Sequence, residues 1–80
     1  MNTQDALSWI AEVFEESVDR IKPGTARQSI AGWDSLGTLS LIAALDERFN
    51  IHLSETEIEA MAKVDDILAL LKREGALAEA

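Results

Sequence analysis

The sequence contains no cysteine and a single histidine, His52. Without cysteine, the chain can form neither a disulfide framework nor a thiolate metal site. One histidine cannot make a histidine-rich metal centre, and the chain has no alternating Asp/Asn loop with a closing glutamate to bind calcium. No nucleophile has a neighbouring base of its own either. We therefore expect no metal site and no catalytic residue, which means a protein that is not an enzyme.

Basic residues and long apolar runs are also scarce. Lysine and arginine number seven against fifteen aspartate and glutamate residues, which gives a net charge of −8. Because phosphate contacts need clustered basic groups, we expect neither nucleic acid nor anionic membranes as partners. The longest apolar run, residues 42–45, is far too short to span a membrane, and the first residues lack the pattern of a signal peptide. These features predict a cytoplasmic protein without a membrane span.

The excess of acidic residues lies mostly in the middle of the chain. Residues 33–62 contain six acidic residues and one basic residue. Such a charge can serve solubility alone, or it can attract and orient proteins that present basic patches. Its concentration in one segment favours the second interpretation.

Helical patterns dominate the sequence. The chain has 80 residues, 48% of them hydrophobic, which is enough for one compact domain over residues 1–80. Apolar residues at three- and four-residue steps predict a first helix over residues 3–19, with Thr3 as N-cap and Pro23-Gly24 as its stop. Residues 22–33 then form a loop that is long for a helix connection, and such loops are often functional. The apolar stripe of the first helix consists of Leu7, Ile10, Phe14, Val18 and Ile21.

Three further helices are predicted from their capping residues. The second starts at Asp34-Ser35, either of which can cap it, and ends near Asn50, which tolerates the left-handed conformation. The third is short and begins at a capping box, residues 54–57. The fourth spans residues 65–74 and leaves residues 76–80 as a frayed tail. We therefore predict an all-α protein, a small four-helix bundle with three longer helices and a short third one.

The second helix has two apolar faces. The opposite side from the core, which we call the outer face, carries Leu36, Leu39 and Ala43. Either residues 22–33 pack over the outer face, or it is a docking surface for partner proteins, flanked by Asp46 and Glu47. We favour the docking surface. The face expected to pack in the core contains Thr38, Leu41, Ile42, Leu45 and Phe49.

Ser35 lies where the long loop meets the second helix, next to the outer face. A serine at a helix start is commonly only an N-cap. As a nucleophile it has no base, because His52 lies beyond the far end of the helix. An exposed serine in this position fits a modification site that a separate enzyme activates.

A family resemblance rests on these same residues. Gly32-Trp33-Asp34-Ser35-Leu36 resembles the Gly-x-Asp-Ser-Leu signature of acyl and peptidyl carrier proteins. Residues 37–49 resemble the second helix of that family, and residues 50–58 resemble its following loop and third helix. The resemblance extends over essentially the whole chain, including its length, acidity and order of four helices. It is that of a free-standing phosphopantetheine-binding carrier, with similarity also to aminoacyl carrier proteins.

The resemblance implies a 4′-phosphopantetheine arm on Ser35, transferred from coenzyme A by a separate phosphopantetheinyl transferase, with Asp34 supporting the modification. The arm would hold an acyl or aminoacyl group as a thioester, and its thiol would explain a chain that needs no cysteine. The implied partners are the transferase and acyl or aminoacyl ligases, synthases or transferases with basic patches. These enzymes would dock on the outer face, and their basic patches would contact Asp46 and Glu47. The family also implies a monomer.

Four positions depart from carriers of bulk fatty-acid synthesis. Gly37 and Ser40 stand where such carriers usually have acidic residues, Arg48 replaces a frequent acid, and Trp33 replaces a small residue. These differences resemble free-standing carriers of specialised pathways.

The residues leave two kinds of cargo and one other function open. A fatty or polyketide chain would require a cleft between Leu41, Leu45 and Ile58, because an apolar chain gains by leaving water. An amino acid or short acid could remain outside the bundle. The alternative to a carrier is an unmodified acidic helical interaction module that binds one basic partner, with Ser35 only as a cap.

Overall fold

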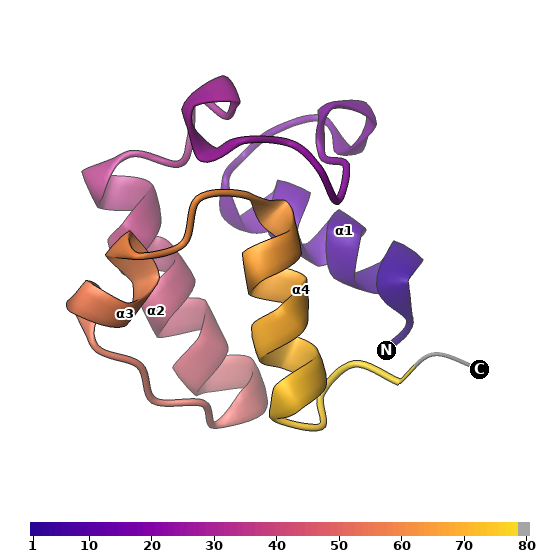
Figure 1. The fold of residues 1–80 in the computed structure, drawn as a ribbon, viewed down its shortest axis with the longest axis vertical. Coiled ribbons are helices and arrows are strands. Elements are labelled where there is room, and N and C mark those ends of the chain that lie inside the picture. Colours follow the sequence, from indigo (N-terminus) through magenta and orange to yellow (C-terminus); the bar gives the residue numbers. More distant parts are fainter. Residues whose placement is uncertain (79–80) are drawn as a thin grey trace.

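The computed structural model describes residues 1–78, and four α-helices account for most of them. In Figure 1, α4 lies at the centre of the view, with α2 and α3 to one side and α1 to the other. Residues 1–78 contain no strand, only an isolated bridge between Ala26 and Lys63. The predicted all-α bundle, with three longer helices and a short third one, is confirmed. The helices are α1 (Thr3–Val13), α2 (Ser35–Phe49), α3 (Glu55–Glu59) and α4 (Val64–Arg73).

The first helix is shorter than predicted. Asn2 rather than Thr3 is its N-cap, and the Asn2 side chain accepts the backbone N–H of Asp5 at 2.8 Å. At the other end, Glu15 adopts the left-handed conformation with a φ of 55°, which closes α1 in a Schellman-type turn. The last turn contains no basic residue to offset the negative end of the helix dipole. Val18, predicted in the apolar stripe of this helix, lies instead in a separate 3-10 helix and is 39% exposed.

The connection between α1 and α2 is long, as predicted, and is anchored to the start of α4. Two 3-10 helices, Val18–Arg20 and Arg27–Ser29, interrupt it. Figure 1 shows the connection passing over the first turn of α4. It is therefore held against α4 rather than laid over the outer face of α2. Three backbone hydrogen bonds fix it there: from Asp65 to Pro23 at 2.8 Å, from Val64 to Thr25 at 3.0 Å and from Arg27 to Ala62 at 2.9 Å.

The predicted caps of α2 and α3 are confirmed. Asp34 is the N-cap of α2, and Asn50, with a φ of 56°, closes it in the left-handed conformation. α3 begins at the expected capping box, in which Ser54 and Glu57 each accept a backbone N–H of the other. These caps satisfy backbone groups that have no partner within the helix, which fixes where each helix starts and stops.

The core is made by one face of each helix. Leu41 and Leu45 of α2, Ile58 of α3 and Leu71 of α4 are 0% exposed. Thr38, one turn into α2, is 2% exposed. The predicted core face of α2 is therefore correct at its centre. Two of its members, Ile42 and Phe49, are half-buried at the edge of the core.

The end of the described chain is packed rather than frayed. Leu77 is 8% exposed, and the N–H of Ala76 donates to the carbonyl of Leu71 at 2.8 Å. The N–H of Ala78 donates to the carbonyl of Met1 at 2.8 Å, which brings the two ends of the described chain together. The expectation of a frayed tail is thus wrong for residues 76–78. Residues 79–80 of that predicted tail lie outside the described part.

Candidate functional site at the start of the second helix

Ser35 is the first residue of α2 and is not its cap. The carboxylate of Asp34 accepts the N–H of Gly37 at 2.8 Å, and the carbonyl of Asp34 accepts the N–H of Thr38 at 2.8 Å. Asp34 therefore takes the capping role that either residue could have had. Ser35 is exposed, and its hydroxyl makes no hydrogen bond within residues 1–78. The hydroxyl is free to react with an external group.

Within residues 1–78, no base is hydrogen-bonded to the Ser35 hydroxyl. His52, the single histidine, follows the far end of α2, which is about 20 Å long at 1.5 Å per residue. Its Nδ1 lies 3.0 Å from a carboxylate oxygen of Asp46 instead. The carboxylate of Asp34 is adjacent in sequence but is engaged by the N–H of Gly37. Among the described residues, none is therefore placed to take the proton of the Ser35 hydroxyl.

The start of α2 is seated on other backbone segments. Gly37 is buried, and a Cβ at this position would collide with the carbonyl of Gly32. A Cβ on Gly32 would in turn collide with the carbonyl of Phe14 at the end of α1. The end of α1, the end of the connection and the first turn of α2 are thus in direct backbone contact. This contact fixes the position of the neighbouring Ser35.

Arg27 and Trp33 pack beneath this helix start. The ring of Trp33 is 4% exposed and stacks on Phe14, with ring centroids 5.1 Å apart and an angle of 17° between the rings. The guanidinium of Arg27 lies 5.3 Å from the centre of the Trp33 ring. The same guanidinium donates to Thr38 Oγ1 at 3.1 Å and to the carbonyl of Glu59 at 3.3 Å. Arg27 was not predicted as a site residue, because its position in the long loop is the only signal that the sequence gives for it.

The outer face of α2 is uncovered. Leu36 is 72% exposed and Leu39 is 52% exposed, and Ala43 is exposed one turn further along. The alternative that residues 22–33 pack over this face is therefore wrong. The reason is the anchoring of that segment to the start of α4.

The two acidic residues predicted to flank the outer face are both exposed, at the far end of α2 from Ser35. Glu47 continues the row of Leu36, Leu39 and Ala43 at helical spacing. Asp46 is paired with His52, and both side chains of the pair are more than half exposed. An exposed pair of this kind contributes little to stability. Both carboxylates can therefore meet a partner from solvent.

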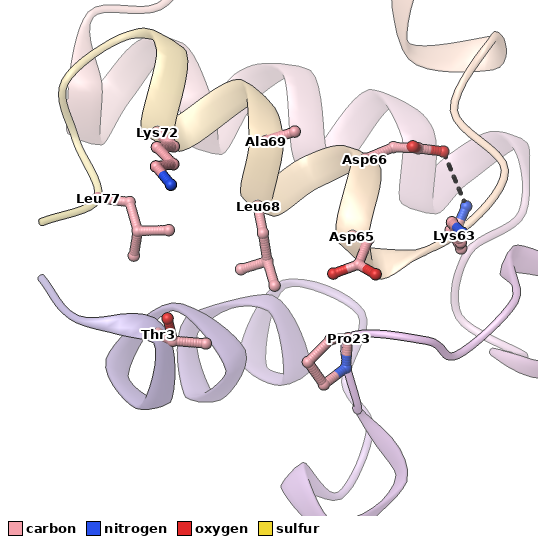
Figure 2. Close-up of a pocket in the computed structure, with 9 residues that line it drawn as sticks. All are labelled: Thr3, Pro23, Lys63, Asp65, Asp66, Leu68, Ala69, Lys72 and Leu77. Atoms are coloured by element: carbon pink, nitrogen blue, oxygen red, sulfur yellow. Dashed lines mark hydrogen bonds between the residues drawn. The ribbon is translucent and has the colours of Figure 1, made fainter. Parts of the chain in front are cut away.

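The larger surface grooves lie away from Ser35. A groove of about 500 Å³ runs between α1 and α4, and Figure 2 shows Leu68 pointing from α4 towards α1 within it. Lys63, Asp65 and Lys72 give it mixed charge, and no residue of α2 lines it. A second groove of about 400 Å³ lies between α3 and α4, next to Met61 and Leu70. Neither groove contacts the predicted cargo cleft residues Leu41, Leu45 and Ile58.

Residues 1–78 contain no cluster of three or more histidine, cysteine, aspartate or glutamate side chains that could hold a metal ion. Within the same residues, no helix combines the length and apolarity needed to cross a membrane.

Comparisons with known proteins find relatives but no matching family model. The chain is similar to an acyl carrier protein of Sulfurovum sp., with 29% identity over 68 residues, 85% of this chain and 91% of that protein. It is also similar to an acyl carrier protein of Helicobacter pylori, with 29% identity over 69 residues, 86% of this chain and 88% of that protein. Acyl carrier protein 3, chloroplastic, of Hordeum vulgare is 38% identical over 50 residues, 62% of this chain. The chain spans 38% of the length of that plant protein.

Proposed function

We propose that the chain, which is similar to acyl carrier proteins over most of its length, is a carrier of that family. In this proposal it holds an acyl or aminoacyl group as a thioester on a 4′-phosphopantetheine arm attached to Ser35. Its relatives are non-catalytic carriers, and in this proposal the chain is likewise a substrate of other enzymes rather than an enzyme. The observation that carries the proposal is the exposed Ser35 hydroxyl, unbonded within residues 1–78, at the first position of a helix that Asp34 already caps.

The residues at the start of α2 fit such an arm. The backbone contact of Gly32 and Gly37 holds Ser35 in a fixed position, so the arm would leave the protein from a defined point. A phosphodiester on Ser35 would lie at the positive end of the α2 dipole, where a negative charge is favourable. When bound, the arm supplies a thiol that forms the thioester with the carried acid. The chain itself contributes the attachment oxygen and the helix end that orients it.

The attachment requires a separate phosphopantetheinyl transferase. Ser35 Oγ must lose its proton as it bonds to the phosphate, and within residues 1–78 its hydroxyl has no hydrogen-bonded base to accept that proton. Asp34 keeps α2 capped and exposes a carboxylate edge next to Ser35, which supports the reaction in the transferase complex.

Partner enzymes dock on the outer face of α2 in this proposal. Leu36, Leu39 and Ala43 provide exposed apolar contacts in one row beginning beside Ser35. Asp46 and Glu47 provide negative charge at the far end of that row, which favours partners with basic patches, such as acyl or aminoacyl ligases, synthases and transferases.

The pathway is a specialised one rather than bulk fatty-acid synthesis. The acids that would mark a bulk carrier are absent at Gly37 and Ser40, and Arg48 adds a positive charge to the same helix. Position 37 is buried against Gly32, so an acid there would not fit this backbone. In the same proposal, residues 1–80 work as one carrier domain, as a monomer in the cytoplasm.

Intact mass measurement tests the attachment. The wild-type chain, Ser35→Ala and Ser40→Ala are each incubated with coenzyme A, magnesium and a broad-specificity phosphopantetheinyl transferase. Ser40 is an exposed serine on the same helix, so it controls for general damage to α2. We expect one pantetheine-sized increase in the wild type and in Ser40→Ala, and none in Ser35→Ala. A folded, previously unmodified wild type that gains no mass would overturn the proposal and leave the acidic interaction module as the function.

A further inference from the structure

Arg27 joins three parts of the molecule at one point. Its guanidinium donates to Thr38 Oγ1 on α2 and to the carbonyl of Glu59 at the end of α3, and it covers the ring of Trp33. Its backbone N–H also donates to the carbonyl of Ala62, in the segment that leads from α3 to α4. Arg27 therefore links α2 to α3 through its side chain and holds the segment after α3 through its backbone.

This link lies at the end of α2 where Ser35 begins the helix. Thr38 is three residues after Ser35, which is one helical turn, and it is 2% exposed. Leu41 and Leu45 follow Thr38 on the same buried face at further turns. Thr38, which Arg27 binds, is therefore the side chain of this buried face that lies nearest to Ser35. The apolar residues Leu41 and Leu45 lie further along the helix.

The apolar interior behind Arg27 is closed. Leu41, Leu45 and Ile58 are all 0% exposed, so an alkyl chain could enter between α2 and α3 only if the two helices moved apart. Such a movement would break the bonds from Arg27 to Thr38 and Glu59. It would also remove Thr38 Oγ1, the part-buried acceptor of the guanidinium, which is unfavourable for a cation at this depth.

We propose that Arg27 is a latch that holds α3 against α2 and keeps the group carried on Ser35 outside the bundle. The carrier thereby selects short or polar cargo, such as aminoacyl groups and short acids, which gain little from burial. This inference rests on the proposed function, since it concerns a group attached at Ser35.

Amide hydrogen exchange on the full chain tests the latch in two arms. The first uses unmodified protein and compares the wild type with Arg27→Met, which keeps an apolar stem but removes the guanidinium. Arg20→Met is the matched control, because Arg20 is an exposed arginine in the same connection. We expect the amides of Ile58 in α3 and of Ala60, the C-cap of α3, to exchange at least tenfold faster in Arg27→Met. Rates in Arg20→Met should stay within twofold of wild type.

The second arm uses protein loaded by the transferase from octanoyl- or acetyl-coenzyme A. In the wild type we expect the amides of Leu41, Leu45 and Ile58 to exchange at rates within twofold of each other in the two loaded forms. In Arg27→Met we expect the octanoyl form to exchange at least tenfold more slowly than the acetyl form, because the chain can then enter the interior.

Each other outcome overturns the latch. Octanoyl-specific protection in the wild type would mean that the chain enters with Arg27 in place. Unchanged α3 exchange in Arg27→Met, or no octanoyl effect in it, would mean that Arg27 does not close the interior. If Arg27→Met does not fold, Thr38→Val replaces it, because it removes only the bond to Thr38, and the same shifts are expected at about threefold. A wild type that gains no mass in the transferase reaction would overturn the proposed function instead. The hydrogen-exchange comparison of unmodified proteins would still decide whether Arg27 holds α3 against α2.

Discussion

Gly32 and Gly37 allow three stretches of backbone to meet directly beneath Ser35. A side-chain carbon at either position would overlap a carbonyl group, of Phe14 in one case and of Gly32 in the other. Packing therefore explains the glycine at position 37, and the glycine also means that this position carries no negative charge. Position 37 has no acid because α2 rests on the end of the α1–α2 connection at this residue.

This contact predicts a loss of stability in Gly37→Ala. In an open helical position, alanine would stabilise the protein relative to glycine by about 1 kcal/mol. At position 37 the added carbon must push backbone apart, so we expect the free energy of unfolding to fall by roughly 1–3 kcal/mol. Gly24→Ala is the control, because no atom lies within 4 Å of its added carbon. Urea unfolding measures both, and a Gly37→Ala protein more stable than wild type would contradict the contact.

At the scale of helices, the end of α1 carries conformational strain. Glu15 has a φ of 55°, which costs a residue with a side chain about 1 kcal/mol but costs glycine almost nothing. The residue also places a negative charge at the negative end of the α1 dipole. Both effects make the turn after Val13 less stable than it could be.

Glu15→Gly should therefore raise the free energy of unfolding by about 0.5–1 kcal/mol. Glu12→Gly is the matched variant inside α1, and there we expect a fall of about 1 kcal/mol. Glu15→Gln removes the charge and keeps the side chain. It should therefore raise the free energy of unfolding by less than Glu15→Gly does, because it relieves only the unfavourable interaction with the helix dipole. If Glu15→Gly and Glu12→Gly destabilised the protein equally in urea unfolding, the strain at residue 15 would be disproved.

The helices that could be predicted from sequence are those whose ends are set by neighbouring residues. Asp34 caps a group three residues away, Ser54 and Glu57 cap each other, and Asn50 adopts the left-handed conformation that its side chain tolerates. The end of α1 was missed because Glu15 gives no such signal. Arg27 was missed because its acceptor on Glu59 is 32 residues away, and no local pattern reports a contact of that range.

Over the whole molecule, most leucines fall into two sets, one in the core and one on the outer face of α2. Those of the core, such as Leu41, Leu45 and Leu71, have no exposed surface, and Leu77 joins them at 8% exposure. Leu36 and Leu39 are 72% and 52% exposed on the outer face and contribute little to the core. The sequence indicated this division within α2 because helical spacing separates the two faces. It did not indicate the place of Leu77, which depends on contacts between the two ends of the described chain.

The division predicts opposite effects for Leu36→Ala and Leu77→Ala. Leu77→Ala removes buried apolar contacts, so we expect its free energy of unfolding to fall by about 2 kcal/mol. Leu36→Ala should change it by less than about 0.5 kcal/mol. If partners dock on the outer face, Leu36→Ala should lower the kcat/KM of the transferase at least about fivefold, equivalent to about 1 kcal/mol of contact energy. Leu77→Ala should be measured at a temperature where it remains folded. Its kcat/KM with the transferase should then lie within about twofold of the wild-type value, because the substitution lowers stability and does not alter the outer face. Equal kcat/KM values for wild type and Leu36→Ala would place the transferase contact elsewhere on this chain, even if Ser35 were the modified residue.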